Sequence, residues 1–263
     1  MSNKALPVFA WFVPLAPLAL AFLIYFGELQ SSSFLFLNQL AHLLPDTLWA
    51  WLTFLGNGWG VFAITFPLLL LAPRALSAGI FAGAISAIVS ATLKNYFDLP
   101  RPAGVLVDGS FYRLGEPLLH KAFPSGHTLT AFAIATALYF SCDKDKRKLM
   151  LLLFVIASLV GLSRNAVGAH WLTDVLGGAG FGIWCGMLGA LIANKIPERY
   201  LALKGVWLRL IAIGGIVAIY AHLTQIMDHE LNLPLQYASI AILLITLALF
   251  IKGQLNMSLT KSE

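Results

Sequence analysis

The chain has 263 residues, of which 59% are hydrophobic and only 11% are charged. Soluble domains carry charge on about a quarter of their residues, so this composition excludes a water-soluble globular protein and favours a membrane helix bundle. A net charge of +5 is compatible with nucleic-acid binding, but the basic residues are placed as membrane orientation requires, and no nucleic-acid partner is expected.

Apolar runs long enough to cross ~30 Å of hydrocarbon occur along the whole chain. The first follows a single lysine, Lys4, and no small-residue cleavage site comes after it, so it is interpreted as an uncleaved anchor rather than a signal peptide. No internal repeat or soluble domain interrupts the series. The sequence therefore predicts an all-α, polytopic membrane bundle with eight spans, at about residues 7–27, 48–72, 76–96, 125–141, 149–167, 173–193, 207–224 and 237–251.

Basic residues predict how this bundle is oriented, because cytoplasmic loops are enriched in lysine and arginine. With the N-terminus in the cytoplasm, eight spans return the C-terminus to the cytoplasm, and the outer loops 28–47 and 225–236 contain no lysine or arginine. We expect a multi-pass protein of the inner (plasma) membrane with both termini inside. Twelve of the 17 basic residues then lie inside: Lys4, Arg74, Lys144, Lys146, Arg147, Lys148, Lys195, Arg199, Lys204, Arg209, Lys252 and Lys261.

Five basic residues remain on the outer side, and orientation does not explain them. Lys94 and Arg164 each end an apolar span, and Arg101 begins the loop that follows Lys94. A cation at the end of a span is costly unless it reaches the interface or serves a site. These three are expected to bind an anion, whereas the roles of Arg113 and Lys121 stay open.

Three clusters of chemically active residues lie on this outer side. Three cations can surround a phosphoryl group, whose transition state spreads negative charge over its oxygens. Arginine binds such oxygens through a planar fork, and lysine acts as a point charge. The clusters are KNYFDLPRP at residues 94–102, PSGH at residues 124–127 and SRNAVGAHWLTD at residues 163–174.

The two histidines of these clusters supply nucleophilic and proton-transfer chemistry. His170 and Asp174 are four residues apart, so on one helical face the carboxylate can hold one imidazole nitrogen as N–H while the other attacks. His127 would then donate a proton to the leaving oxygen. Ser125 and Gly126 precede a helical run, so backbone N–H groups there can bind an oxyanion.

The three clusters, complete and in order, resemble the type-2 phosphatidic acid phosphatase family, within the superfamily that includes the vanadium haloperoxidases. The family pattern is KxxxxxxRP, then PSGH, then SRxxxxxHxxxD, and each part is intact in this chain. The resemblance covers about residues 7–193 and implies a six-helix phosphatase core. We therefore expect residues 1–204 to form this membrane-embedded core and residues 205–263 to add a C-terminal transmembrane hairpin.

Carried over to the matching positions, the resemblance implies a phosphate-binding set. Lys94, Arg101 and Arg164 would bind the phosphate. Ser125 and Gly126 would support its oxygens.

The same resemblance implies the reacting groups. His127 would be the general acid, and His170, oriented by Asp174, would be the nucleophile that forms a phosphohistidine. No metal or other cofactor is expected. Cys142 and Cys185 form neither a disulfide framework nor a zinc motif.

The implied activity is that of an integral-membrane lipid phosphatase that acts on a lipid phosphate or diphosphate in the bilayer, at the outer, periplasmic face. Candidate substrates from the family are undecaprenyl diphosphate, phosphatidylglycerol phosphate, phosphatidic acid and lipid A phosphate. Two alternatives stay open: transfer of the phosphate to a second lipid, and a non-catalytic lipid transporter or scramblase that kept the fold. A haloperoxidase is disfavoured by the transmembrane setting, and the oligomeric state is not predicted.

The remaining notable residues are assigned to structure. The spacing of Gly178, Gly182 and Gly186, repeated by Gly79 and Gly83, predicts close helix packing. Asn57 predicts a kink in the second span. Structural or solvated roles are expected for His42, His120, His222, His229, Asp98 and Asp108.

Overall fold

The computed structural model describes residues 6–259, and every regular element in that range is helical. Six segments are long and apolar enough to cross a membrane: Val8–Phe26, Pro73–Gly104, Lys144–Ala166, Leu172–Asn194, Glu198–Thr224 and Glu230–Asn256. The prediction of an all-α, multi-pass membrane bundle is confirmed. Lys4 and Lys261, which the predicted orientation places inside, lie outside the described residues.

Four helices form the centre of the bundle, and α7 lies between the other three. These helices are α6 (Pro73–Phe97), α7 (Gly126–Ser141), α8 (Arg147–Ala166) and α9 (Leu172–Asn194). The short turns η1 (Val8–Trp11) and η3 (Lys144–Lys146) lead into α1 (Leu15–Phe26) and α8. Helix α7 coincides with the span predicted at about 125–141, but its 16 residues are fewer than the ~20 that a membrane-crossing helix needs.

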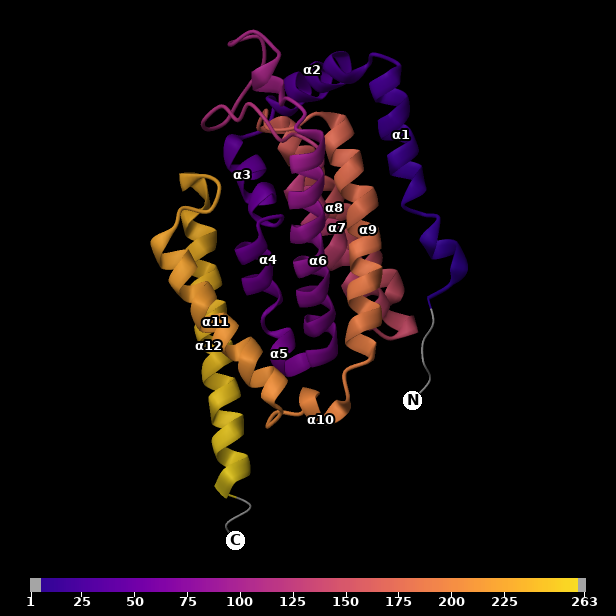
Figure 1. Cartoon of the computed structure of the whole chain (residues 1–263). Helices are drawn as coiled ribbons and strands as arrows, with labels where there is room; N and C mark the ends of the chain where they lie inside the picture. The colour runs from indigo at the N-terminus through magenta and orange to yellow at the C-terminus, as the bar shows by residue number, and fades with distance from the viewer. Residues whose placement is uncertain (1–5, 260–263) are drawn as a thin grey trace.

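The second predicted span, 48–72, is not one helix. It consists of α3 (Asp46–Phe54), α4 (Gly58–Thr65) and α5 (Leu68–Leu71), which follow one another along the bundle (Figure 1). The side chain of Asn57 accepts a hydrogen bond from the backbone N–H of Trp59 at 3.0 Å and caps α4, and Pro67 precedes α5. The predicted kink at Asn57 is therefore a complete break, and the prediction of a continuous span is wrong.

Glycines bring α9 against α7. A Cβ atom at Gly178 would lie 2.7 Å from the carbonyl oxygen of Ser125, and one at Gly182 would lie 2.5 Å from that of Leu129. Both separations are too short for any side chain, so the two backbones touch. The helix-packing role predicted for this glycine series is confirmed.

The other glycine pair behaves differently. A Cβ atom at Gly83 would meet no heavy atom within 4 Å, and one at Gly79 would meet only the tip of Ile134, at 3.5 Å. Both glycines line an apolar cavity of about 720 Å³ between α4, α6, α7 and α11 (Val206–Thr224). The prediction that this pair packs two helices closely is wrong, because the missing side chains leave open space instead.

The last third of the chain adds a helical hairpin. After α10 (Glu198–Leu201), α11 and α12 (Leu233–Leu259) run antiparallel and are joined by a loop that includes η4 (Glu230–Asn232). The hairpin packs against α4 and α5, with Phe66, Leu208 and Leu243 buried at the contact. A division of the chain at residue 204 stays a prediction.

One end of the bundle is covered by non-spanning segments. The α11–α12 loop, the loop of residues 98–125 with η2 (Pro102–Gly104), and α2 (Gln30–Ala41) all lie there (Figure 1). Helix α2 was predicted only as a loop, and it lies across the bundle. Its Asn38 donates hydrogen bonds to the carbonyl oxygens of Asn165 and Ala166, each at 3.1 Å, which fixes the end of α8.

Candidate active site

A buried histidine–aspartate pair lies where α8 turns into α9. Gly168 has φ +75, a conformation that side chains disfavour, and it lets the chain reverse between Arg164 and His170. Nδ1 of His170 lies 3.2 Å from Oδ2 of Asp174, and each side chain is 2% exposed. The same carboxylate oxygen accepts the backbone N–H of Trp171 at 2.9 Å, so the start of α9 holds Asp174 in place.

Arg101 identifies which nitrogen of His170 carries the proton. Its Nη1 lies 3.2 Å from Nε2 of His170. A guanidinium group only donates hydrogen bonds, so Nε2 accepts, and the proton is on Nδ1, facing Asp174. Burial, followed by the charges of Arg101, Arg164 and Lys94, holds the pKa of His170 well below its usual range. The imidazole is therefore neutral near pH 7, with its lone pair on Nε2.

Arg101 also ties two loops together. Its guanidinium donates to the carbonyl oxygens of His120 at 2.9 Å and Ala169 at 3.2 Å. A longer bond, of 3.5 Å, reaches the carbonyl oxygen of Lys121. Three of its contacts are thus to backbone carbonyl oxygens, and Arg101 as a whole residue is 8% exposed, so it forms a fixed part of the wall of the site.

The other two predicted phosphate ligands belong to the same group of charges. Arg164, on the last turn of α8, is 6% exposed, and its Nη1 donates to Oγ1 of Thr53 at 3.2 Å. Among the described residues, its buried Nε has no hydrogen-bond acceptor. Lys94 lies on the last turn of α6, and its charge interacts with those of Arg101, Asp174 and Arg164. Three cations from three segments therefore converge near His170.

Ser125 joins the starts of α7 and α9. Its backbone N–H donates to the carbonyl oxygen of Asp174 at 3.0 Å, and its buried hydroxyl oxygen accepts from the hydroxyl of Thr128 at 2.9 Å. The N–H of Ser125 is thus committed to a helix contact, whereas its hydroxyl only accepts in these bonds and keeps its own hydrogen to donate. The support predicted for phosphate oxygens from Ser125 and Gly126 stays a prediction, with the Ser125 hydroxyl and the N–H groups of the first turn of α7 as the donors.

His127 has a partner that sequence reasoning missed. Its Nε2 lies 2.9 Å from Oδ1 of Asp228, in the α11–α12 loop, and Oδ2 of Asp228 accepts from the side-chain amide of Asn57 at 3.0 Å. Although burial alone would raise the pKa of Asp228, the charge and hydrogen bond of His127, then Arg164 and Asn57, hold it well below its usual range. The sequence showed only that Asp228 lies in a loop without lysine or arginine, which is predicted to be on the outer side.

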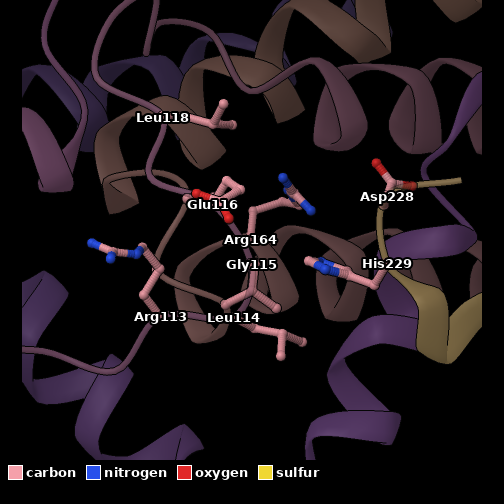
Figure 2. A pocket seen from close by; sticks show the side chains of 11 residues that line it. Arg113, Leu114, Gly115, Glu116, Leu118, Arg164, Asp228 and His229 are labelled. Atoms are coloured by element: carbon pink, nitrogen blue, oxygen red, sulfur yellow. The ribbon is translucent and has the colours of Figure 1, made fainter. Parts of the chain in front are cut away.

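A cavity of about 250 Å³ opens beside these residues and is lined by Arg113, Arg164, Asp228 and His229, among others. Figure 2 shows the side chains of Arg164 and His229 pointing into it from different elements. His229, expected to be structural, thus lies at the cavity. Arg113 pairs with Asp108 at 3.1 Å, and the Asp108 side chain is 86% exposed, in agreement with its predicted solvated position.

No group of three or more histidine, cysteine, aspartate or glutamate side chains that could hold a metal ion occurs within residues 6–256. What the arrangement offers is a neutral imidazole with its lone pair among three cations, and a second imidazole paired with a carboxylate. These are the requirements for nucleophilic attack on a phosphoryl group with proton donation to the leaving oxygen.

Comparison with known proteins identifies a family match, several related sequences and a related solved structure. Residues 75–198, which contain all three clusters, match the PAP2 superfamily. A lipid A 1-phosphatase of Porphyromonas gingivalis is 35% identical over 97 residues, which make up 35% of this chain and 22% of that protein. Phosphatidylglycerophosphatase B of Bacillus subtilis is 39% identical over 77 residues, 26% of this chain and 38% of that protein. The matched regions thus span well under half of these two relatives.

A solved structure is matched over nearly its whole length. The crystal structure of LpxE from Aquifex aeolicus is 32% identical in sequence, with a TM-score of 0.55, and the match covers 61% of this chain and 94% of that one. Fold, family pattern and sequence identity agree, and the chain belongs to the PAP2 superfamily.

Proposed function

We propose that this protein is a metal-independent membrane phosphatase that hydrolyses a lipid phosphate or diphosphate through a phosphohistidine at His170. The observation that supports this most strongly is the state of His170. Its Nδ1–H is held by Asp174 at 3.2 Å, and its lone pair on Nε2 faces the guanidinium of Arg101. A nucleophile placed among cations is suited to attack an anionic phosphorus centre, because the cations offset the repulsion between lone pair and phosphate.

The first half of the reaction forms the covalent intermediate. Lys94, Arg101 and Arg164 bind the phosphoryl oxygens, and Arg101 exchanges its contact with Nε2 for one with a phosphoryl oxygen. Nε2 of His170 attacks phosphorus, the bond to the leaving oxygen breaks, and His127 gives that oxygen a proton. Asp174 stabilises the positive charge that His170 acquires.

The second half releases phosphate. His127, now neutral, takes a proton from a water molecule as that water attacks the phosphohistidine. The P–N bond breaks, inorganic phosphate leaves, and both imidazoles return to their starting protonation states. Each proton given in the first half is recovered in the second, so the cycle needs no metal and no redox partner.

The apolar cavity beside α6 supports a lipid as the substrate. It begins at Asn57, one contact away from Asp228, and extends along Gly79 and Gly83 into the apolar part of the bundle. Its volume of about 720 Å³ accommodates a hydrocarbon chain whose phosphate lies at the covered end. The names of the relatives make lipid A phosphate and phosphatidylglycerophosphate natural candidates, beside undecaprenyl diphosphate and phosphatidic acid.

The basic residues support an active site on the outer, periplasmic face of the inner membrane, with both termini in the cytoplasm. At the opposite end of the bundle, Arg74 donates to the carbonyl oxygens of Ala193 and Ile196 and pairs with Glu198 at 2.7 Å. Lysine and arginine residues of the loops at that end satisfy the positive-inside rule.

Phosphate release from a panel of lipid phosphates by the purified protein in detergent tests this function. We expect release from at least one lipid, inhibition by vanadate, and no loss in the presence of a chelator. An alkaline quench during turnover should trap phosphate on His170, since phosphohistidine survives base. Release without a trapped histidine adduct, or release that the chelator stops, would contradict the mechanism, and transfer of phosphate to a second lipid would show a phosphotransferase.

A further inference from the structure

We propose that Asp228 is a positioning residue for the general acid. It holds Nε2 of His127 and stabilises the protonated imidazole, so that Nδ1 presents the proton to the leaving oxygen. This role presupposes the phosphatase activity proposed above, because it adds a member to the same site. It also gives the α11–α12 hairpin a part in the reaction.

The geometry places Asp228 at the meeting point of three elements. Its two oxygens bind His127, in the first turn of α7, and Asn57, the cap of α4, at 2.9 and 3.0 Å. The chain at Gly56 lies directly on His127, since a Cβ atom there would be 2.9 Å from the carbonyl oxygen of His127. The Asp228 side chain is 15% exposed, and the two bonds hold its carboxylate in one orientation.

The loop around Asp228 is held by buried amides. Gln236 accepts from the N–H of Met227 at 3.0 Å and donates to the carbonyl oxygen of Gln225 at 2.8 Å. Asn232 donates to the carbonyl oxygen of Met227 at 2.9 Å. Asp228 itself has φ +63, which non-glycine residues seldom adopt. Strain of this kind persists where the surroundings require one side-chain direction.

The charges around His127 explain why a carboxylate is needed. A general acid must begin protonated, but burial, followed by the charge of Arg164, lowers the pKa of His127. Asp228 supplies the compensating negative charge and is ionised at neutral pH, because its pKa is below the usual range. The groups whose charges interact with His127 are Arg164 of α8, Lys94 of α6, His170 before α9, and Asp228 and His229 of the loop.

The test compares Asp228→Asn with Glu230→Gln, the same chemical change at an exposed residue two positions along the same loop. Both full-length variants are assayed on a lipid phosphate, whose alkoxide leaving group needs a proton, and on an aryl phosphate, whose leaving group departs without one. For Asp228→Asn we expect kcat on the lipid to fall about 10- to 100-fold, part of the ~10²–10⁴ that a general acid contributes. On the aryl phosphate the loss should be less than about threefold.

The pH profile on the lipid substrate gives an independent reading. Removing the carboxylate lowers the pKa of the acid, so the alkaline limb of kcat should move to lower pH while the acid limb stays. Asp228→Glu should restore part of the rate, and Glu230→Gln should match the wild type.

Two outcomes overturn the role of Asp228: wild-type kinetics in Asp228→Asn, or an equal loss on both substrates with an unchanged alkaline limb. The second pattern would show a purely structural residue. A wild-type protein that releases phosphate from no lipid would instead overturn the phosphatase function itself, so the two failures are distinguishable.

Discussion

The two histidine–aspartate pairs of the site are built in opposite ways. His170 and Asp174 are four residues apart, fixed by the start of one helix, and each is 2% exposed. His127 and Asp228 are 101 residues apart, in the middle of the chain and in the loop between its last two long helices, and their side chains are 21% and 15% exposed. A nucleophile benefits from a dry and rigid setting, whereas an acid that must exchange protons needs access to water. The first pair depends on local helix geometry, and the second depends on how the last hairpin packs.

Removing the proposed nucleophile, His170, should have the largest effect. His170→Ala is expected to lower kcat by about 10⁴-fold or more, because the proposed reaction loses its nucleophile. Phosphate release and the alkaline-quench adduct are the measurements, with thermal unfolding in detergent as a control for folding. Activity within tenfold of the wild type would show that the nucleophile lies elsewhere.

Asp174→Asn should follow, with a loss of about 10³-fold. The amide cannot fix the proton on Nδ1 as the carboxylate does, so His170 loses both its tautomer and its stabilised positive charge. Because the second pair acts on a different proton, the loss should be as large on an aryl phosphate as on a lipid phosphate. Kinetics on both substrates test this. If Asp174→Asn instead lost much more activity on the lipid phosphate than on the aryl phosphate, as expected for Asp228→Asn, the two pairs would act on the same step and the contrast between them would be wrong.

The close contact between α9, which holds Asp174, and α7 should tolerate little change in packing. Gly182→Ala places a Cβ atom 2.5 Å from the carbonyl oxygen of Leu129, so α9 must move away from α7, at a cost of about 1–3 kcal/mol of unfolding free energy. Gly83→Ala, the matched control on α6, meets no atom within 4 Å and should be neutral or slightly stabilising. Thermal unfolding midpoints measure both. Equal midpoints for the two variants would contradict the difference in packing.

The smallest effect concerns the acid limb of the pH profile. Because burial and neighbouring cations lower the pKa of His170, the imidazole stays neutral and reactive below its ordinary pKa of ~6.5 and becomes protonated only at lower pH. The acid limb of kcat/KM should therefore lie below pH ~6.5, and it should be unchanged in Asp228→Asn. A limb at or above this value would mean that His170 is not held in a buried, cationic environment.

The local pair was predictable and the distant one was not, for a physical reason. The spacing of His170 and Asp174 is a property of the helix, so it can be read from the sequence. The contact between Asp228 and His127 depends on how α11 and α12 pack against the bundle, and the distance between the two residues in the sequence does not reveal it. Sequence likewise identified the cations and the apolar segments, because charge and hydropathy are local properties.

The differences within the fold have similar causes. Asn57 and Pro67 interrupt an apolar run that hydropathy alone reads as continuous, since hydropathy ignores capping and proline geometry. Gly83 has the spacing of a packing motif, yet no helix approaches it, because the same missing side chain can admit a neighbour or leave a cavity. Which helix lies opposite the glycine decides between close packing and a cavity, and the glycine spacing alone does not show this.

The 101-residue separation of His127 and Asp228 would give the enzyme an order of maturation. Chains emerge from the ribosome N-terminus first, so α9 can bring its nucleophile to the phosphate ligands while the final hairpin is still being synthesised. The proton donor would gain its partner only after α11 and α12 insert and settle beside α4. The full rate would then be reached only at the end of biogenesis, and a chain whose last hairpin has not inserted would be a slow enzyme.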